Sequence, residues 1–224
     1  MTGPLRALLK VWMRISKFPS TVGGMSTDVA DARTGWASVL LVVGGLLMAV
    51  LWLIFTTAHG PTSFNEDRTV LGGSMLVWGM LLGGIPNLLI AAGLVLFSSR
   101  VALATGRSAR VGYVLTLIGL IAPALIDLSI QALGAPFFLP IAAIGMALLA
   151  CGNRHNPRVS RPSRLLLMAI GVLLAIAMAW ALLSNALTDP IGGYRIFGIV
   201  AYLGAGTGWA LFGISIRGAS PHPT

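Results

Sequence analysis

The stretch that decides the fold is WASVLLVVGGLLMAVLWLIFT, residues 36–56, which contains no charged side chain. An α-helix needs about 20 apolar residues to cross about 30 Å of hydrocarbon, and this stretch meets that need. Five more apolar runs follow, at residues 71–98, 111–133, 135–150, 165–183 and 191–216. Of the six runs, only the fourth, at residues 135–150, is short. The sequence therefore predicts six membrane-spanning helices.

The composition also indicates an integral membrane protein. Hydrophobic residues make up 56% of the 224 residues, charged residues make up 9%, and the mean hydropathy is +0.89. Soluble globular domains average about 25% charged residues, so a water-soluble core is excluded. The predicted fold class is an all-α integral membrane protein, with a cytoplasmic amphipathic arm at 1–35, a six-helix membrane domain at 36–216 and a cytoplasmic tail at 217–224.

The basic residues predict how the chain lies in the membrane. With the N-terminus in the cytoplasm, 13 of the 15 Lys and Arg residues face the cytoplasm, and Arg68 and Arg195 lie outside. The positive-inside rule favours this arrangement, in which both termini are cytoplasmic. The same positions account for the formal net charge of +9 without a nucleic-acid partner. The excess of 13 Arg over 2 Lys, together with many Ala and Gly, indicates a bacterial protein and hence the inner membrane.

The N-terminal arm has a helical pattern of its own. Leucines and Trp12 recur on one face, and a basic stripe runs along another, formed by Arg6, Lys10, Arg14 and Lys17. This pattern is typical of a helix that lies in the membrane plane and contacts anionic lipid head groups at the cytoplasmic face. A competing interpretation places the true start of the chain at Met25, which removes the arm altogether.

Short links and small residues predict how the helices meet. The third and fourth runs are separated by little more than Gly134, Ala135 and Pro136, which predicts a tight antiparallel helix hairpin. Two GxxxG pairs predict close helix contacts, within this chain or with another. They are Gly79 with Gly83 in the second run, and Gly204 with Gly208 in the sixth.

Asp127 is the carboxylate that lies well inside a predicted span. A charged group in hydrocarbon costs at least about 2.5–3.5 kcal/mol, so Asp127 is expected to have a partner. Gln131 follows one turn later on the same helix face, and Arg195 enters the sixth run from the outer side at a similar depth. The favoured interpretation is that a pair with Arg195, or a bond to Gln131, fastens two helices. The alternative is a proton or cation site.

Proline and glycine interrupt the middle of two runs. Pro86 and Asn87 follow two glycines in the second run, and Pro123 lies in the third, so both helices are expected to bend. Interrupted helices with polar residues near the membrane centre are typical of substrate sites in transporters. Asn87 and Thr207 are therefore candidate cavity residues together with Asp127, although helix packing explains the same features.

The sequence contains no recognisable catalytic, metal or cofactor motif, and no cofactor or metal is expected. With Cys151 as its single cysteine, the chain cannot form an internal disulfide. Whether the protein is an enzyme stays open. The leading interpretation is a non-catalytic accessory or assembly subunit, with a membrane protein or a second copy of the chain as its partner. The first alternative is a small proton-coupled transporter or channel that uses Asp127, and the second is a lipid-modifying membrane enzyme.

Overall fold

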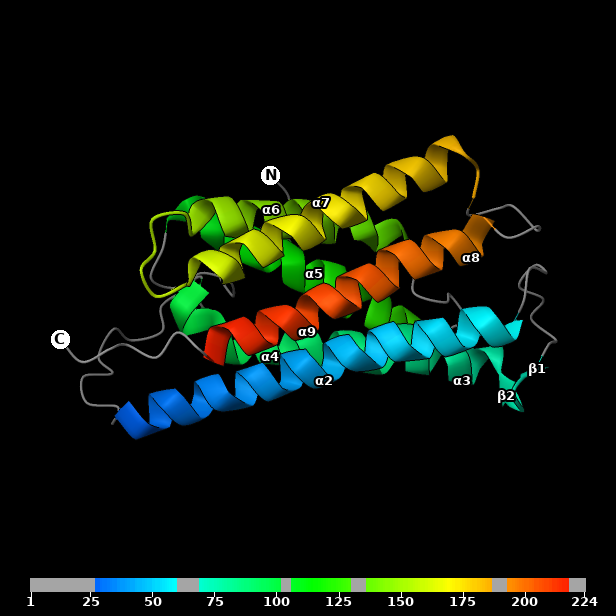
Figure 1. Cartoon of the computed structure of the whole chain (residues 1–224), viewed down its shortest axis with the longest axis horizontal. Helices are drawn as coiled ribbons and strands as arrows, with labels where there is room; N and C mark the ends of the chain where they lie inside the picture. The colour runs from blue at the N-terminus through cyan, green and yellow to red at the C-terminus, as the bar shows by residue number, and fades with distance from the viewer. Residues whose placement is uncertain (1–26, 60–68, 102–105, 130–135, 187–192, 218–224) are drawn as a thin grey trace, which may run out of the picture. The chain divides into compact units, whose positions relative to one another are not determined.

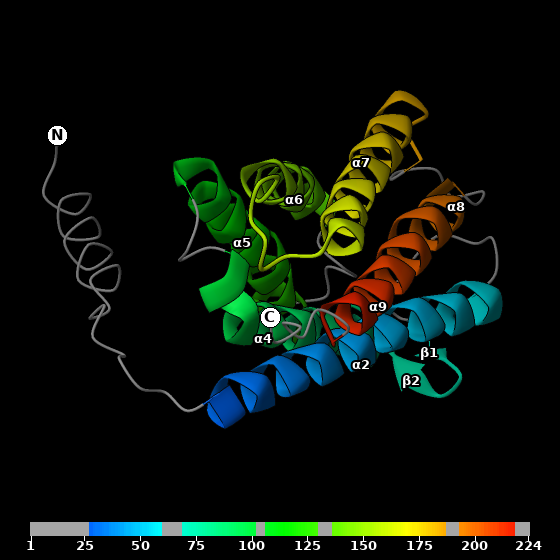
Figure 2. The same cartoon turned by 60° about the vertical axis from the view of Figure 1, so that its left-hand side comes forward.

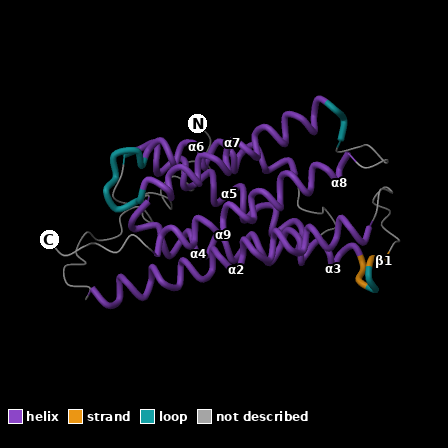
Figure 3. Tube along the Cα trace, viewed as in Figure 1, coloured by secondary structure: helices purple, strands orange, loops and turns teal. Residues whose placement is uncertain are grey.

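A computed structural model describes residues 27–59, 69–101, 106–129, 136–186 and 193–217, and helices dominate these segments (Figure 3). The elements in chain order are α2 (Thr27–His59), β1 (Thr69–Val70), β2 (Gly73–Ser74), α3 (Met75–Gly79), the π-helix η1 (Met80–Gly84), α4 (Ile85–Val101), α5 (Arg107–Ser129), the 3₁₀ helix η2 (Pro136–Phe138), α6 (Leu139–Gly152), α7 (Arg161–Leu183), α8 (Gly193–Gly198), the π-helix η3 (Ile199–Leu203) and α9 (Gly204–Arg217).

Contacts divide the chain into two units, residues 1–32 and residues 33–224. Of the first unit, the structure describes residues 27–32, which form the start of helix α2. The predicted interfacial helix of the arm, with its basic residues, lies outside the described residues. All that follows concerns the second unit.

Five helical segments are long and apolar enough to cross a membrane: Asp31–Ala58, Met75–Val101, Arg107–Ser129, Arg161–Leu183 and Arg195–Arg217. The sixth apolar segment, Pro136–Gly152, is shorter. Large apolar side chains are exposed on these helices, for example Leu46 on α2 (50% exposed) and Ile176 on α7 (62%). Such surfaces are rare on soluble monomers, whereas hydrocarbon solvates them well.

The second apolar run does not begin as a helix. Residues 69–74 form a β-hairpin, because Leu71 and Gly72 both have positive φ (51° and 77°), as a two-residue turn of this kind requires. The Trp78 indole nitrogen donates to the Val70 carbonyl at 2.8 Å and holds the hairpin on α3. Ser74 accepts a hydrogen bond from the Val77 N–H and so caps the new helix, which starts at Met75. The predicted start at residue 71 is therefore wrong.

Helices α5 and α6 are antiparallel and touch backbone to backbone. Glycine has no Cβ, so the space around the position of an added Cβ shows how closely the other helix approaches. A Cβ added at Gly112 would lie 2.4 Å from the Leu149 nitrogen, and one added at Gly145 would lie 2.4 Å from the Thr116 nitrogen. The contact continues to Gly152, whose added Cβ would be 2.5 Å from the nitrogen of Ala109. This register shows the antiparallel pairing predicted for the third and fourth runs, and Figure 1 shows the two helices together. The predicted tight link between them lies largely outside the described residues.

Helices α2 and α9 come from opposite ends of the chain and form a second close contact (Figures 1 and 2). Added Cβ atoms at Gly45 and Gly206 would lie 2.5 and 2.6 Å from the carbonyl oxygen of the opposite glycine. Near the end of α9, the buried Ser38 hydroxyl donates to the Gly213 carbonyl at 2.7 Å. In lipid, helices associate through such close packing and interhelical hydrogen bonds, because the hydrophobic effect supplies little force between them.

Two spans contain a π-helical segment in mid-course. In η1 the Ile85 N–H donates to the Met80 carbonyl, five residues back, directly before Pro86. Since proline has no N–H to donate, a regular helix would break at this point, and the wider turn accompanies the missing bond. The second segment, η3, contains no proline and separates α8 from α9.

Candidate functional site

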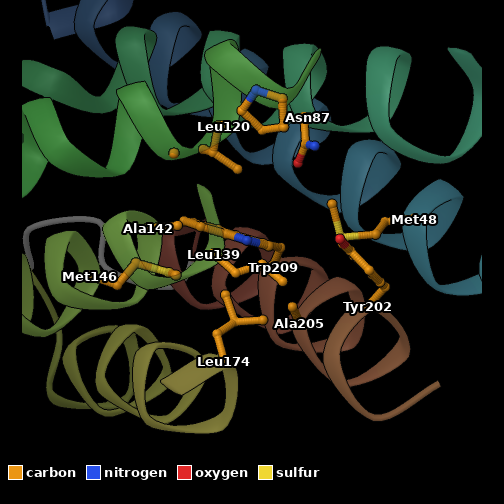
Figure 4. Close-up of a pocket in the computed structure, with 12 residues that line it drawn as sticks. Met48, Asn87, Leu120, Leu139, Ala142, Met146, Leu174, Tyr202, Ala205 and Trp209 are labelled. Carbon is orange, nitrogen blue, oxygen red and sulfur yellow. The ribbon is translucent and has the colours of Figure 1, made fainter. Parts of the chain in front are cut away.

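A small cavity lies where α2, α4, α5, α6, α7 and the last span meet (Figure 4). Its volume is about 20 Å³, and because one water needs about 10–15 Å³ measured in this way, it has room for one or two water molecules. Most of the lining is apolar, and its polar groups come from Asn87, Tyr202 and the Trp209 indole. The described residues thus enclose a water-sized polar space in a hydrophobic interior.

Asn87 brings an amide to this cavity. The residue is 5% exposed and lies three positions after the end of η1, so the π-helical turn and Pro86 set where its side chain emerges. Figure 4 shows that side chain directed from α4 into the space that Met48 and Tyr202 border. Among the described residues, no hydrogen bond involves the Asn87 side chain. A buried amide is costly unless it is hydrogen-bonded, so a water in the cavity is the natural partner.

Helix α5 supplies a backbone acceptor to the lining of the cavity. Gly119 and Pro123 lie one turn apart on α5, and both line the cavity. Because Pro123 has no N–H, the Gly119 carbonyl lacks the donor that a regular helix would provide four residues later. The interrupted helix therefore leaves a carbonyl beside the same space that receives the Asn87 amide.

Tyr202 enters from the second π-helical segment. Its ring stacks on the Trp52 indole of α2, with centroids 4.1 Å apart and planes 6° from parallel. Gly198, one turn earlier, has no side chain to block this contact, since an added Cβ would lie 2.7 Å from the Trp52 ring. Stacked aromatic rings contribute about 0.5–1.5 kcal/mol beyond their buried area, so this contact fixes η3 against α2.

Asp127 is fully buried on α5, one turn beyond Pro123. A Cβ added at Gly79 would lie 3.6 Å from the backbone carbonyl oxygen of Asp127. The second span therefore packs against this part of α5. The structure thus places the carboxylate in the interior. Its predicted partner, Arg195 or Gln131, stays a prediction.

The other predicted polar residues lie in different surroundings. Arg195 is half-buried near the start of α8, Thr207 is exposed on α9, and Gln131 lies outside the described residues. Of the five candidates, Asn87 is the one that the structure places in the cavity lining. Thr207 therefore points away from the space that Asn87 borders.

The predicted packing glycines differ in what they meet. An added Cβ would lie 2.4 Å from a Leu173 methyl at Gly204 and 2.5 Å from Ile170 Cγ1 at Gly208, so both glycines face side chains of α7. Gly79 has more room, at 3.6 Å from its neighbour, and Gly83 is buried in η1. The tightest backbone contacts use other glycines, on α5, α6, α2 and α9.

A pair of buried asparagines was not predicted. The Asn153 amide donates to the carbonyls of Val101 (2.9 Å) and Leu149 (2.8 Å), and the Asn156 amide donates to the Arg100 carbonyl (2.7 Å) and to the Asn153 side-chain oxygen (2.7 Å). The accepting carbonyls lie in the last turns of α4 and α6, where backbone carbonyls have no donor within their own helix. The signal in the sequence is the turn chemistry of Asn153, directly after the helix-terminating Gly152, and of Asn156 followed by Pro157.

The arrangement offers little for metal chemistry. Within the described segments, no three His, Cys, Asp or Glu residues lie close enough together to hold a metal ion. Cys151 is exposed at the end of α6, and the structure describes no disulfide for it.

The fold and this interior define a multi-pass helical membrane protein, because several long apolar helices expose apolar faces and bury their polar groups in pairs and turns. Contact with a lipid bilayer follows from the same surfaces. Comparison of the chain with protein-family models, with curated proteins and with solved structures gave no match.

Proposed function

We propose that the chain forms six membrane spans, with both termini on the cytoplasmic side of a bacterial inner membrane. The support for the fourth span is the position of α6, whose backbone follows α5 from Gly152 beside Ala109 to Ala142 beside Gly119. The support for the orientation is the division of Lys and Arg, 13 against 2. The amphipathic arm, with Arg6, Lys10, Arg14 and Lys17, belongs to this proposal as a helix on the cytoplasmic leaflet.

Cysteine accessibility in intact cells tests the orientation. Cys151→Ser provides a background without native cysteine, into which single cysteines are placed at Ser63, Thr105, Pro157 or Leu187. We expect a membrane-impermeant thiol reagent to label positions 63 and 187 from outside, and to reach positions 105 and 157 only after the cells are opened. Labelling of 105 and 157 in intact cells would contradict the orientation.

Within the membrane, we propose a non-catalytic role as an accessory or assembly subunit, in which the buried polar residues hold helices together. The observation that carries this proposal is the close packing of the described interior. Helix backbones touch at Gly112 and Gly145 and again at Gly45 and Gly206, and the cavity between them has room for water alone. A rigid body of this kind is suited to presenting a fixed surface to a partner.

Asp127 provides the test of this role. As a helix fastener paired with Arg195 or Gln131, its carboxylate contributes about 0.6–2 kcal/mol, the range of hydrogen bonds inside membranes. We expect Asp127→Asn to lower the thermal midpoint of the detergent-solubilised protein. Liposomes that contain either protein should show the same proton leak, followed with an enclosed pH-sensitive dye.

One specific observation favours a small transporter or channel instead. A residue of the π-helical segment η3, Tyr202, lines the cavity, as does Asn87, which follows η1 by three residues, and π-helical turns are frequent at functional sites. This alternative predicts that the wild-type protein carries a pH-dependent flux which Asp127→Asn abolishes while the thermal midpoint stays unchanged. The same two measurements therefore separate the two roles.

A further inference from the structure

The loop between α6 and α7 is a rigid support for outward-facing arginines. The Asn156 N–H donates to the Asn153 carbonyl (3.0 Å) and the Val159 N–H donates to the Asn156 carbonyl (3.3 Å), so two turns follow each other at a spacing of three residues. This spacing buries Asn153, Asn156 and Val159, and leaves Arg154 and Arg158 exposed. The orientation of these two arginines is therefore set by the buried side of the loop.

Hydrogen bonds hold the loop in place at both ends. The amides of Asn153 and Asn156 attach it to the end of α4, as described above. The Arg164 guanidinium, from the first turns of α7, donates to the carbonyls of Asn153, at 3.1 Å, and Arg154. The hydrogen bonds of Arg164 thus stabilise the loop, and its positive charge adds to the charges of Arg154, Arg158 and Arg161.

Further arginines from two helices surround the loop. Arg161 is exposed in the first turn of α7, and Arg107 and Arg110 are exposed in the first turn of α5. The start of α5 lies beside the start of the loop, because an added Cβ at Gly152 would be 2.5 Å from the Ala109 nitrogen. We define the arginine site as the five exposed side chains of Arg107, Arg110, Arg154, Arg158 and Arg161.

The arginine site has no nearby acidic residue within the described part of the second unit. Asp127 is the one carboxylate among residues 33–59, 69–101, 106–129, 136–186 and 193–217, and it lies about 30 Å along α5 from Arg107, at 1.5 Å per residue. That distance exceeds the Debye length of about 8 Å at physiological ionic strength. Among these described residues, no carboxylate therefore offsets the charge of the arginine site, which favours the binding of an anion.

The surroundings of the site favour a lipid as the source of that anion. Val111 follows Arg110 directly and is 51% exposed, and Leu165 follows Arg161 by one turn and is 59% exposed. Arg110 and Arg161 are thus each followed along the helix by an exposed apolar side chain that an acyl chain can cover. Guanidinium groups bind phosphate oxygens through paired hydrogen bonds, and basic pockets at the ends of membrane helices bind phospholipid head groups.

We propose that the arginine site binds the phosphate of an anionic phospholipid whose acyl chains lie against α5 and α7. This inference rests on the membrane placement proposed above and does not depend on which side of the membrane the site faces. The cysteine labelling therefore tests the orientation separately from the lipid binding.

Native mass spectrometry of the full chain, with added phosphatidylglycerol or phosphatidylcholine, tests the proposal. We expect phosphatidylglycerol to bind the wild-type protein and phosphatidylcholine to bind at least tenfold more weakly. The triple variant Arg154→Gln, Arg158→Gln, Arg161→Gln should bind phosphatidylglycerol on the order of a hundredfold more weakly, since each basic residue near the membrane surface contributes about fivefold. Its thermal midpoint should not change, because these side chains are exposed.

Two matched variants separate a built site from general charge. Arg33→Gln, Arg68→Gln, Arg217→Gln removes three charges outside both the arginine site and the N-terminal arm, and it should leave most of the binding. Replacing Arg154, Arg158 and Arg161 with lysine keeps the charge, removes the paired hydrogen bonds and should weaken binding by about tenfold.

Three results would overturn the proposal. They are equal binding of the two lipids by the wild-type protein, equal loss of binding in the control variant and in the triple glutamine variant of the loop, or displacement of phosphatidylglycerol by millimolar inorganic phosphate. The last result would assign the site to a free phosphate.

Discussion

Helix α5 contacts its neighbours in two different ways within four turns. At Gly112 and Thr116 its backbone touches the backbone of α6, whereas at Gly119 and Pro123 it also borders a water-sized cavity that receives the Asn87 amide. The first contact tolerates no added atom, and the second leaves room for a water. A membrane interior can therefore satisfy its packing with glycine and its polar groups with water along the same helix.

A change at the backbone contact should have the largest effect. In Gly112→Ala the new methyl would lie 2.4 Å from the Leu149 nitrogen, and two helix backbones must separate to accept it. We expect a loss of about 3 kcal/mol in the free energy of unfolding, at the upper end of the cost of overpacking. Thermal unfolding in detergent, followed by circular dichroism, measures it.

Gly204→Ala is the matched control for Gly112→Ala. Its added methyl would also meet an atom at 2.4 Å, but that atom is a terminal methyl of Leu173, which can rotate away. We expect a change of less than about 1 kcal/mol, because the higher helix propensity of alanine offsets the displaced side chain. If both variants lose the same free energy of unfolding, then contact with a backbone and contact with a flexible side chain do not differ in cost.

Removing the Asn153 amide should have an intermediate effect. Asn153→Ala leaves the carbonyl of Val101 without this donor in a fully buried position. The variant loses the two hydrogen bonds that this amide donates and the one that the Asn153 side-chain oxygen accepts from Asn156. Because each hydrogen bond contributes about 0.5–1.5 kcal/mol net, we expect a loss of about 2 kcal/mol. Ser129→Ala removes an exposed hydroxyl that donates to Leu125 in its own helix, and it should leave the unfolding midpoint unchanged.

The cavity predicts the smallest effect. Asn87→Ala should change the free energy of unfolding by less than about 1 kcal/mol, because no described residue loses a hydrogen bond and a second water can fill the space. Leu120→Ala, from the same lining, should cost about 2 kcal/mol or more, since it removes apolar contacts. A loss at Asn87 that equals the loss at Asn153 would mean that the cavity water is as fixed as a protein acceptor.

The sequence predicted the contact between α5 and α6 better than the contacts at the cavity. The short link at residues 134–136 leaves two consecutive helices no arrangement but an antiparallel one, so their pairing was predictable. Asn87 and Thr207 looked alike as polar residues within apolar runs, yet one is buried and the other is exposed. A single polar residue in a run carries no information about which helix face is buried, because an all-round apolar helix has no preferred side.

Local rules also failed at three places. The start of the second run became a β-hairpin, because Leu71 adopts a positive φ that its residue type disfavours. The π-helical turn η3 contains no proline or glycine that would announce it, and its place follows from the stacking of Tyr202 on Trp52. No local rule singled out Asn153, because its role depends on a carbonyl 52 positions earlier in the chain.

The sequence by itself determined that this is a multi-pass helical membrane protein, because apolar runs of sufficient length have no other stable form in contact with lipid. The tertiary structure alone decided which polar groups meet. Asn87 lines the cavity, Asp127 lies in the interior beside the second span, and Asn153 donates a hydrogen bond to the end of α4. These contacts depend on how neighbouring helices are rotated and shifted along their axes relative to one another. Close packing at particular glycines fixes that arrangement, and the sequence of a single apolar run does not specify it.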